Sequence, residues 1–273
     1  MRVAFQGEPG AYSEQAVFNY YGEVGTLPCE SFDVMFDSVA SGKSDAALAP
    51  IENSLAGSIH QNYDLLLRHD LHIVGEYLLR VQHCLIVMPG VKKEDVKTAI
   101  SHPQALGQCA AYLRNLGIKP EAVYDTAGSV KMLKESGARD MAAIASKRAA
   151  ELYEMQILEE GIEDNAENYT RFLAVGRESV VPEKEAKTSI VFTLKNQPGS
   201  LFKAMSVFAL RDIDLTKIES RPLQGKPWEY LFYIDFIGSI HTDVSKRALD
   251  HLGEYALTLR VLGSYPRFIQ VNR

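Results

Sequence analysis

Short apolar runs alternate with segments of helical spacing along the first two thirds of the chain. Ser31, for example, can cap a helix in which Phe32, Met35, Phe36 and Val39 recur at i, i+3, i+4 and i+7. Strands that alternate with helices usually form a mainly parallel sheet flanked by those helices. The sequence therefore predicts an α/β fold, long enough for two lobes with a cleft between them. The expected strands are 2–6, 46–51, 84–88, 98–101, 122–125, 141–145 and 172–175.

The order of the expected strands and helices changes after the segment 178–187. This segment is charged and contains a proline, which is typical of a linker. The strand and helix signals that follow have the order βαββαβ, which is the ferredoxin-like α+β pattern. We therefore predict a larger domain over 1–178 and a smaller one over 187–273. The elements expected in the smaller domain are strands over 188–194, 213–221, 228–237 and 258–265 and helices over 201–209 and 244–252.

Composition excludes several classes of protein. The net charge is -6 and the charges are interleaved, so a nucleic-acid partner is not expected. No apolar run has the length of a membrane span, and none resembles a secretory signal. The three cysteines, Cys29, Cys84 and Cys109, are widely spaced and predict buried, reduced thiols. The seven histidines show no ligand spacing, so neither a metal nor an organic cofactor is expected.

Four loops that should follow strands combine small hydroxyl, amide and glycine residues: 6–13, 52–58, 101–104 and 125–129. Ligands of open α/β sheets gather at such junctions, and the amides of helix N-termini attract carboxylates and phosphates. Each junction taken alone is better explained by helix capping, and His102 is expected to have a capping or structural role. Together, the four favour a site for a small anion with more than one acidic group.

At these junctions the sequence resembles the prephenate dehydratases and the related arogenate dehydratases. The resemblance covers the whole chain. Its signs are Gln-Gly-Glu-Pro-Gly-Ala-Tyr-Ser-Glu at 6–14, Pro-Ile-Glu-Asn-Ser at 50–54, Ser-His-Pro-Gln-Ala at 101–105, Asp-Thr-Ala-Gly-Ser at 125–129 and Asn-Tyr-Thr-Arg-Phe at 168–172. It implies a two-lobed catalytic domain like the periplasmic binding proteins, followed by an ACT regulatory domain. The reaction implied is loss of CO2 and water from prephenate, with arogenate as the alternative substrate and no cofactor.

The resemblance also implies roles for single residues. Thr170 would donate the proton to the leaving hydroxyl, or hydrogen-bond it. Arg171 would pair with a substrate carboxylate or, with equal weight, form a structural ion pair, and Phe172 would pack beneath the site. Asn53, Ser101 and Gln108 match family positions for substrate binding, whereas Glu52 is either an acid with a raised pKa or a charge near a helix terminus. Ser13, Thr126 and Ser129 complete the expected substrate-binding set.

ACT domains pair side by side and bind an amino acid at the shared interface, so the resemblance implies an L-phenylalanine effector and a homodimer or homotetramer. The first effector segment departs from the family's usual Gly-Ala-Leu-Val, because it reads Gly-Ser-Leu-Phe at 199–202. The expected effector residues are Asn196, Gln197, Pro198, Gly199, Ser200, Leu201 and Phe202 in the loop after the first strand, with Leu215, Thr216, Glu219, Ser220, Arg221 and Pro222 on the second strand of the partner copy.

Two other classes of protein remain as alternatives. A non-catalytic anion-binding protein would share the two-lobed pattern, but it would have no use for a sensor domain. An ACT-bearing regulator would need a DNA-reading element, and no basic helix is present. A cytoplasmic location is expected, or a plastid one if a transit peptide has been removed.

Overall fold

The computed structural model describes residues 1–183, 185–223 and 229–269. The chain forms two compact units. The N-terminal unit contains residues 1–67 and 77–172, and the C-terminal unit contains residues 68–76 and 173–273. The segment 68–76 therefore packs with the C-terminal unit, although it lies within the larger domain expected from the sequence.

The first sheet has the strand order β2-β1-β3-β11-β5, with β4 paired to β3. Strand β1 runs parallel to both β2 and β3. Ser31 caps α2 as predicted, since its Oγ accepts from the amide of Val34 at 3.2 Å. The elements are β1 (Arg2–Gln6), α1 (Tyr12–Tyr21), β2 (Gly25–Cys29), α2 (Phe32–Ala40), β3 (Ala46–Asn53), β4 (Gly57–Ser58), α3 (His60–Arg68), β5 (His72–Arg80) and β11 (Tyr169–Gly176).

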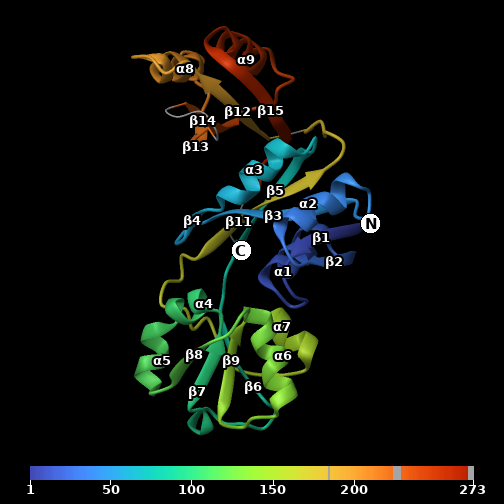
Figure 1. The fold of residues 1–273 in the computed structure, drawn as a ribbon, viewed down its shortest axis with the longest axis vertical. Helices are drawn as coiled ribbons and strands as arrows, with labels where there is room; N and C mark the ends of the chain where they lie inside the picture. The colour runs from blue at the N-terminus through green and yellow to red at the C-terminus, as the bar shows by residue number, and fades with distance from the viewer. Residues whose placement is uncertain (184, 224–228, 270–273) are drawn as a thin grey trace. The chain divides into compact units, whose positions relative to one another are not determined.

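The second sheet has the order β10-β6-β9-β7-β8, with α4 and α5 on one side and α6 and α7 on the other (Figure 1). Strand β7 is parallel to β8 and β9, whereas β6 is antiparallel to β9 and β10. Its elements are β6 (Cys84–Val87), the 3-10 turn η1 (Lys93–Asp95), β7 (Thr98–Ser101), α4 (Pro103–Gln108), α5 (Ala110–Leu116), β8 (Lys119–Ala122), α6 (Thr126–Ser136), β9 (Met141–Ala145), α7 (Lys147–Tyr153) and β10 (Gln156–Glu160).

Two expectations about these sheets need correction. The second sheet is mixed and not mainly parallel, because the chain enters it through β6 and leaves it through β10, and both run against their neighbours. The strand expected at 122–125 is instead β8, which ends at Ala122, and the residues after it lead into α6. Strand β8 is exposed along its whole length, so it lacks the apolar run that marks a buried strand.

The C-terminal unit has the predicted βαββαβ order, and its four antiparallel strands are arranged β13-β14-β12-β15. Both helices pack against the same hydrophobic core, which confirms the ferredoxin-like pattern. The buried face of α8 carries Ala204, Val207 and Phe208, whereas Leu201 and Ala209 are exposed. The elements are β12 (Ala186–Leu194), α8 (Ser200–Ala209), β13 (Leu215–Pro222), β14 (Tyr230–Ile237), α9 (Asp243–Tyr255) and β15 (Ala256–Pro266).

Segment 68–76 covers part of this sheet. The Nζ of Lys187 lies 2.7 Å from Oε1 of Glu76, and the Glu76 side chain is fully buried. A Cβ at Gly263 would lie 2.1 Å from the carbonyl oxygen of Ile73, so only glycine allows β15 to approach this segment so closely. These contacts explain why β12 is buried at every position.

None of the helices in the described ranges has both the length and the apolar character needed to cross a membrane.

Candidate functional site

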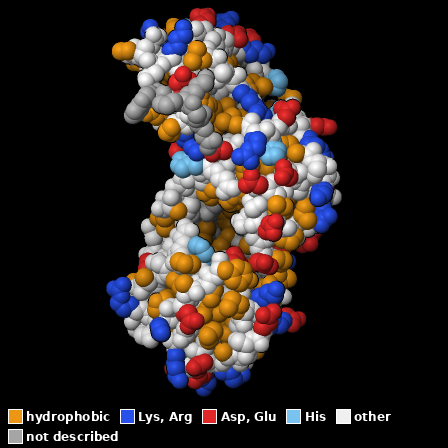
Figure 2. Space-filling model, viewed as in Figure 1, with side chains coloured by type: hydrophobic (Ala, Val, Ile, Leu, Met, Phe, Trp, Pro, Cys, Tyr) orange, Lys and Arg blue, Asp and Glu red, His pale blue; other side chains and the backbone are white. Residues whose placement is uncertain are grey.

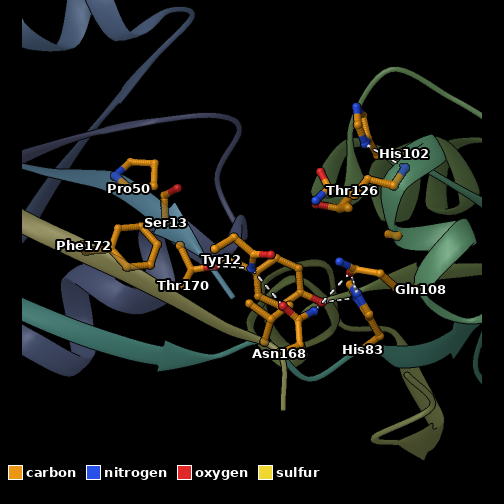
Figure 3. Close-up of a pocket in the computed structure, with 14 residues that line it drawn as sticks. Tyr12, Ser13, Pro50, His83, His102, Gln108, Thr126, Asn168, Thr170 and Phe172 are labelled. Atoms are coloured by element: carbon orange, nitrogen blue, oxygen red, sulfur yellow. Dashed lines mark hydrogen bonds between the residues drawn. The ribbon is translucent and has the colours of Figure 1, made fainter. Parts of the chain in front are cut away.

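A cavity of about 170 Å³ lies within the N-terminal unit, and Figure 3 shows the side chains that surround it. In the space-filling view the unit is hollowed between its two sheets, and hydrophobic side chains are visible inside the hollow (Figure 2). The cavity is lined by Tyr12, Ser13, Pro50, Asn53, Val81, His83, His102, Gln104, Ala105, Gln108, Thr126, Asn168, Thr170 and Phe172.

Helix N-termini supply part of this lining. Helix α1 begins at Tyr12 and α6 begins at Thr126, so Ser13 and Thr126 lie in first helical turns. The first amides of a helix lack partners within the helix and carry partial positive charge. His102 caps α4, because its Nδ1 accepts from the amide of Gln104 at 3.2 Å, which confirms the capping role expected for it. These features suit a ligand with acidic groups.

Asn53 lines the cavity and forms a hydrogen bond with Thr170. Its Oδ1 accepts from the backbone amides of Leu55 and Ala56, at 3.0 and 2.9 Å, so its Nδ2 must face the other way. This Nδ2 donates to Oγ1 of Thr170 at 3.0 Å and to Oδ1 of Asn168 at 2.8 Å. Because the Thr170 oxygen accepts from an amide, its own hydrogen is left to donate to another group.

A second group of hydrogen bonds joins Tyr12, His83 and Gln108. The Tyr12 hydroxyl lies 2.6 Å from Nδ1 of His83, and Nε2 of His83 lies 2.8 Å from Oε1 of Gln108. The same Gln108 oxygen accepts from Nδ2 of Asn168 at 3.2 Å. Burial lowers the pKa of His83 and raises the pKa of Tyr12 well above its usual value, so both side chains are uncharged near neutral pH.

Six of the expected site residues surround this cavity: Ser13, Asn53, Gln108, Thr126, Thr170 and Phe172. Asn53, Thr170 and Phe172 lie on strands β3 and β11 of the first sheet, whereas the other three lie in helices: Ser13 in α1, Gln108 in α4 and Thr126 in α6. Phe172 is almost completely buried, in keeping with its expected place beneath the site.

Four expected substrate contacts are not brought to the cavity. Ser101 and Ser129 are completely buried, and their hydroxyls donate to the carbonyls of Ile144 and Thr126, both at 2.6 Å. Arg171 and Glu52 precede or follow lining residues on β11 and β3 but do not line the cavity themselves. Successive residues of a strand point to opposite faces, so Arg171 faces away from Thr170 and Phe172.

The other lining residues were not expected as ligand contacts. Tyr12, Gln104 and Asn168 belong to the quoted motifs, so the sequence predicts that they lie near the site. Val81 and His83 lie where the chain crosses from β5 to β6, and a single buried histidine there gives no pattern that could be recognised. Pro50 and Ala105 also belong to the quoted motifs, but as small apolar residues they carry no chemical signal of their own.

The C-terminal unit has a cavity of about 110 Å³ at the start of α8. Four expected effector residues line it, whereas Gly199 caps α8 with a φ of 82°. Pro198 and Phe202 are exposed, and the expected residues Leu215, Thr216, Glu219, Ser220, Arg221 and Pro222 lie on β13 at the edge of the sheet, outside the lining. The cavity is lined by Leu194, Lys195, Asn196, Gln197, Ser200, Leu201, Tyr230 and Phe232.

The three cysteines are free and buried, as expected. Within residues 1–183, 185–223 and 229–269, no group of three or more His, Cys, Asp or Glu side chains is arranged to hold a metal ion.

Comparison with known proteins gives the family. Residues 3–180 match the family model for prephenate dehydratase. The chain is 52% identical over 277 residues to arogenate dehydratase/prephenate dehydratase 2, chloroplastic, of Arabidopsis thaliana, covering 97% of this chain and 73% of the relative.

Two solved structures resemble the whole chain. One is the prephenate dehydratase of Arthrobacter aurescens in complex with L-Phe, with a TM-score of 0.89 and 32% identity over 98% of this chain and 90% of that one. The other is GqqA, described as a novel type of quorum quenching acylase, with a TM-score of 0.92 and 35% identity over 98% of both chains. The family match, the plant relative and the bacterial dehydratase agree, and the chain belongs to the prephenate dehydratase family.

Proposed function

We propose that this member of the dehydratase family, a hydro-lyase, converts prephenate into phenylpyruvate by decarboxylating dehydration, with Thr170 as its catalytic residue. The alternative is the same reaction on arogenate, which gives phenylalanine directly and which the name of the Arabidopsis relative includes. That name also describes a chloroplastic protein, which supports the plastid alternative for the location.

The reaction needs few chemical groups. The bond between the ring and its carboxylate breaks, CO2 leaves, and the electron pair enters the ring as the hydroxyl at C4 departs. One proton converts the departing hydroxide into water. Aromatisation supplies the driving force, so the protein has to supply a proton donor, a fixed geometry and a poorly solvated place for the carboxylate that is lost.

One observation carries the proposal: the Thr170 oxygen accepts from the Asn53 amide, at 3.0 Å, at the wall of a cavity that also receives two helix N-termini. A hydrogen bond accepted by the oxygen polarises the hydroxyl, so that its hydrogen is a better donor to the leaving group. Amides at the starts of α1 and α6 would hold the acidic groups of the substrate. Ser13, Gln108 and Thr126 are the proposed polar contacts around the ring.

The experiment that tests this function compares kcat/KM for prephenate and for arogenate. We expect turnover of prephenate, detected by the ultraviolet absorbance of phenylpyruvate in alkali, at a higher kcat/KM than that of arogenate. A higher value for arogenate would assign the chain to the alternative reaction. A purified, folded chain that is inert towards both acids would overturn the proposal.

The hydrogen bonds of the cavity give no support to an acylase activity like the one named for the neighbour GqqA. A hydroxyl nucleophile needs a general base within hydrogen-bonding distance. Thr170 instead has an amide donor, Asn53, beside its oxygen, and both ring nitrogens of His83 are engaged by Tyr12 and Gln108. Dehydration, which needs a hydroxyl donor, fits this arrangement better.

The proposal includes a regulatory part. Residues 1–178 would form the catalytic domain, and 187–273 an ACT domain that binds L-phenylalanine and pairs with a second copy. The ferredoxin-like pattern and the cavity at Asn196 and Leu201 support this assignment, as does the Arthrobacter complex with L-Phe. The segment 215–222 on the exposed edge strand β13 would complete the site from the partner.

Gly199→Val should abolish phenylalanine binding. Gly199 has a φ of 82°, and a β-branched residue is strained in that conformation, so the turn that leads into α8 would change shape. Titration calorimetry at millimolar phenylalanine measures the effect. Gly253→Ala is the matched control, because Gly253 is exposed on α9 and its Cβ would meet no atom within 4 Å. Absence of binding by the unaltered chain, or unchanged binding by Gly199→Val, would contradict the placement.

A further inference from the structure

We propose that His83, held by Tyr12, is a positioning residue that fixes the side-chain amide of Gln108 with its NH2 group towards the cavity. The inference rests on the proposed function, because turnover is one of its measurements. Hydrogen bonds connect Tyr12, His83, Gln108 and Asn168 in that order (Figure 3). Asn168 is joined in turn to Asn53, which also donates to Thr170.

The donor and the acceptor of each hydrogen bond in this series can be deduced from the backbone amides at its start. The amides of Leu55 and Ala56 can only donate, so the Asn53 atom that they contact is its carbonyl oxygen. The Nδ2 of Asn53 therefore donates to Asn168, 2.8 Å away, and the Asn168 atom at this contact is Oδ1. Asn168 is 1% exposed, so its amide has no solvent alternative.

The orientation of Asn168 in turn fixes that of Gln108. With Oδ1 of Asn168 facing Asn53, its Nδ2 faces Gln108 at 3.2 Å and donates to it. The Gln108 atom at this contact must be the acceptor, Oε1. The Nε2 of Gln108, with two hydrogens, has no hydrogen-bond partner among the described residues and is left for a ligand of the cavity that Gln108 lines.

The position of the hydrogen on the His83 ring can be deduced from its contact with the side-chain oxygen of Gln108. The Nε2 of His83 lies 2.8 Å from Oε1 of Gln108, and since that oxygen can only accept, Nε2 carries the hydrogen. The ring is 2% exposed and burial lowers its pKa, so Nδ1 is unprotonated and accepts from the Tyr12 hydroxyl at 2.6 Å. The carbonyl of Gln82, 3.1 Å from the same hydroxyl, is its longer alternative acceptor.

The charged and titratable groups around His83 are compatible with this neutral tautomer. Glu163 accepts from the backbone amide of His83 at 2.9 Å, and Arg80 lies 3.7 Å from the other carboxylate oxygen. The nearby thiols, Cys84 and Cys109, are uncharged because burial raises the pKa of both, that of Cys84 to about 12. Glu163 is therefore the one negative charge near the ring among the described groups that face it.

Without His83, Gln108 would keep only the donor from Asn168 on its oxygen. The side-chain amide could then rotate by half a turn and present Oε1, an acceptor, to the acidic substrate. An unpaired oxygen that faces a carboxylate repels it, whereas the NH2 group binds it. His83 thus acts through Gln108, without contact with the reacting atoms.

A double-mutant cycle on kcat/KM tests this role. His83→Leu should lower kcat/KM roughly 10- to 100-fold, the effect of one lost hydrogen bond to a charged group. In a Gln108→Ala background the same substitution should have an effect of less than about twofold, because Gln108 is no longer there to be positioned. His83→Gln, whose side-chain NH2 group can donate in place of Nε2, should restore at least about half of the loss on a logarithmic scale. Equal losses from His83→Leu in both backgrounds would overturn the inference.

A second measurement is independent of turnover. Nitrogen-15 spectra of histidine-labelled protein distinguish the two neutral tautomers from the imidazolium, so they report the state of His83 directly. We expect the neutral form with hydrogen on Nε2 at pH 7, and a rise in the His83 pKa in Tyr12→Phe, since the phenol stabilises the neutral ring. Hydrogen on Nδ1, or an imidazolium at pH 7, would overturn the inference. An inert chain with the expected spectrum would refute only the proposed function.

Discussion

Thr170→Ala lowers kcat by about two to four orders of magnitude and leaves KM similar, if Thr170 donates the proton to the leaving hydroxyl. The side chain lies at the cavity wall with its oxygen occupied by the Asn53 amide, so its hydrogen is the part available to the substrate. Alanine removes that donor while the helix N-termini that are proposed to bind the carboxylates stay in place. Steady-state kinetics with prephenate measures both constants.

Thr170→Ser is the matched control, because it keeps the hydroxyl and removes only a methyl group. We expect it to retain most of the turnover. Near-normal turnover by a folded Thr170→Ala would remove Thr170 from the mechanism. An equal loss in Thr170→Ser would mean that packing of the methyl group, and not the hydroxyl, explains the effect.

Glu76→Gln should lower the free energy of unfolding by about 3–5 kcal/mol, the usual cost of breaking a buried ion pair by removing one partner. The Glu76 side chain is fully buried and that of Lys187 is 11% exposed, so the ammonium would be left without a carboxylate. Glu76 also accepts from the backbone amide of Phe268 at 3.1 Å, and an amide in its place can keep that bond. Urea unfolding followed by circular dichroism measures the change.

Two variants make this second result specific. The pair Lys147–Glu160 is about half exposed on both sides, so Glu160→Gln should leave the free energy of unfolding nearly unchanged. Replacing both buried charges, as Glu76→Leu with Lys187→Met, should recover much of the loss, because neither charge is then left uncompensated. A loss below 1 kcal/mol in Glu76→Gln would show that the buried pair contributes little.

The parts of the fold that could be predicted from the sequence are those with a buried face. Strands 2–6, 98–101 and 141–145 were found at their bounds because they are apolar runs between turns. In the first two sheets the missed or misplaced strands β2, β5, β8 and β10 lie at the edges, and the two-residue strand β4 was missed as well. An edge strand can lack a buried apolar run, as the fully exposed β8 does, whereas the edge strand β13 of the third sheet, whose half-buried and exposed residues alternate, was predicted.

Some residues of the candidate site could be predicted from the sequence and others could not. Junction residues such as Ser13 and Thr126 could be predicted because helix N-termini follow strands in an α/β fold. Ser101 and Ser129 have the same chemistry and positions near the same junctions, but their hydroxyls turn inward to backbone carbonyls, which no local pattern encodes. His83 was missed because its role depends on contacts with residues 71 and 25 positions away.

A crystal structure of Thr170→Ala with prephenate tests the central claim most directly, because the variant should bind the acid without consuming it. We expect the ring inside the cavity, a carboxylate at the N-terminus of α1 or α6, and the hydroxyl at C4 facing residue 170. Prephenate bound elsewhere on the chain, or with that hydroxyl turned away from residue 170, would contradict the claim.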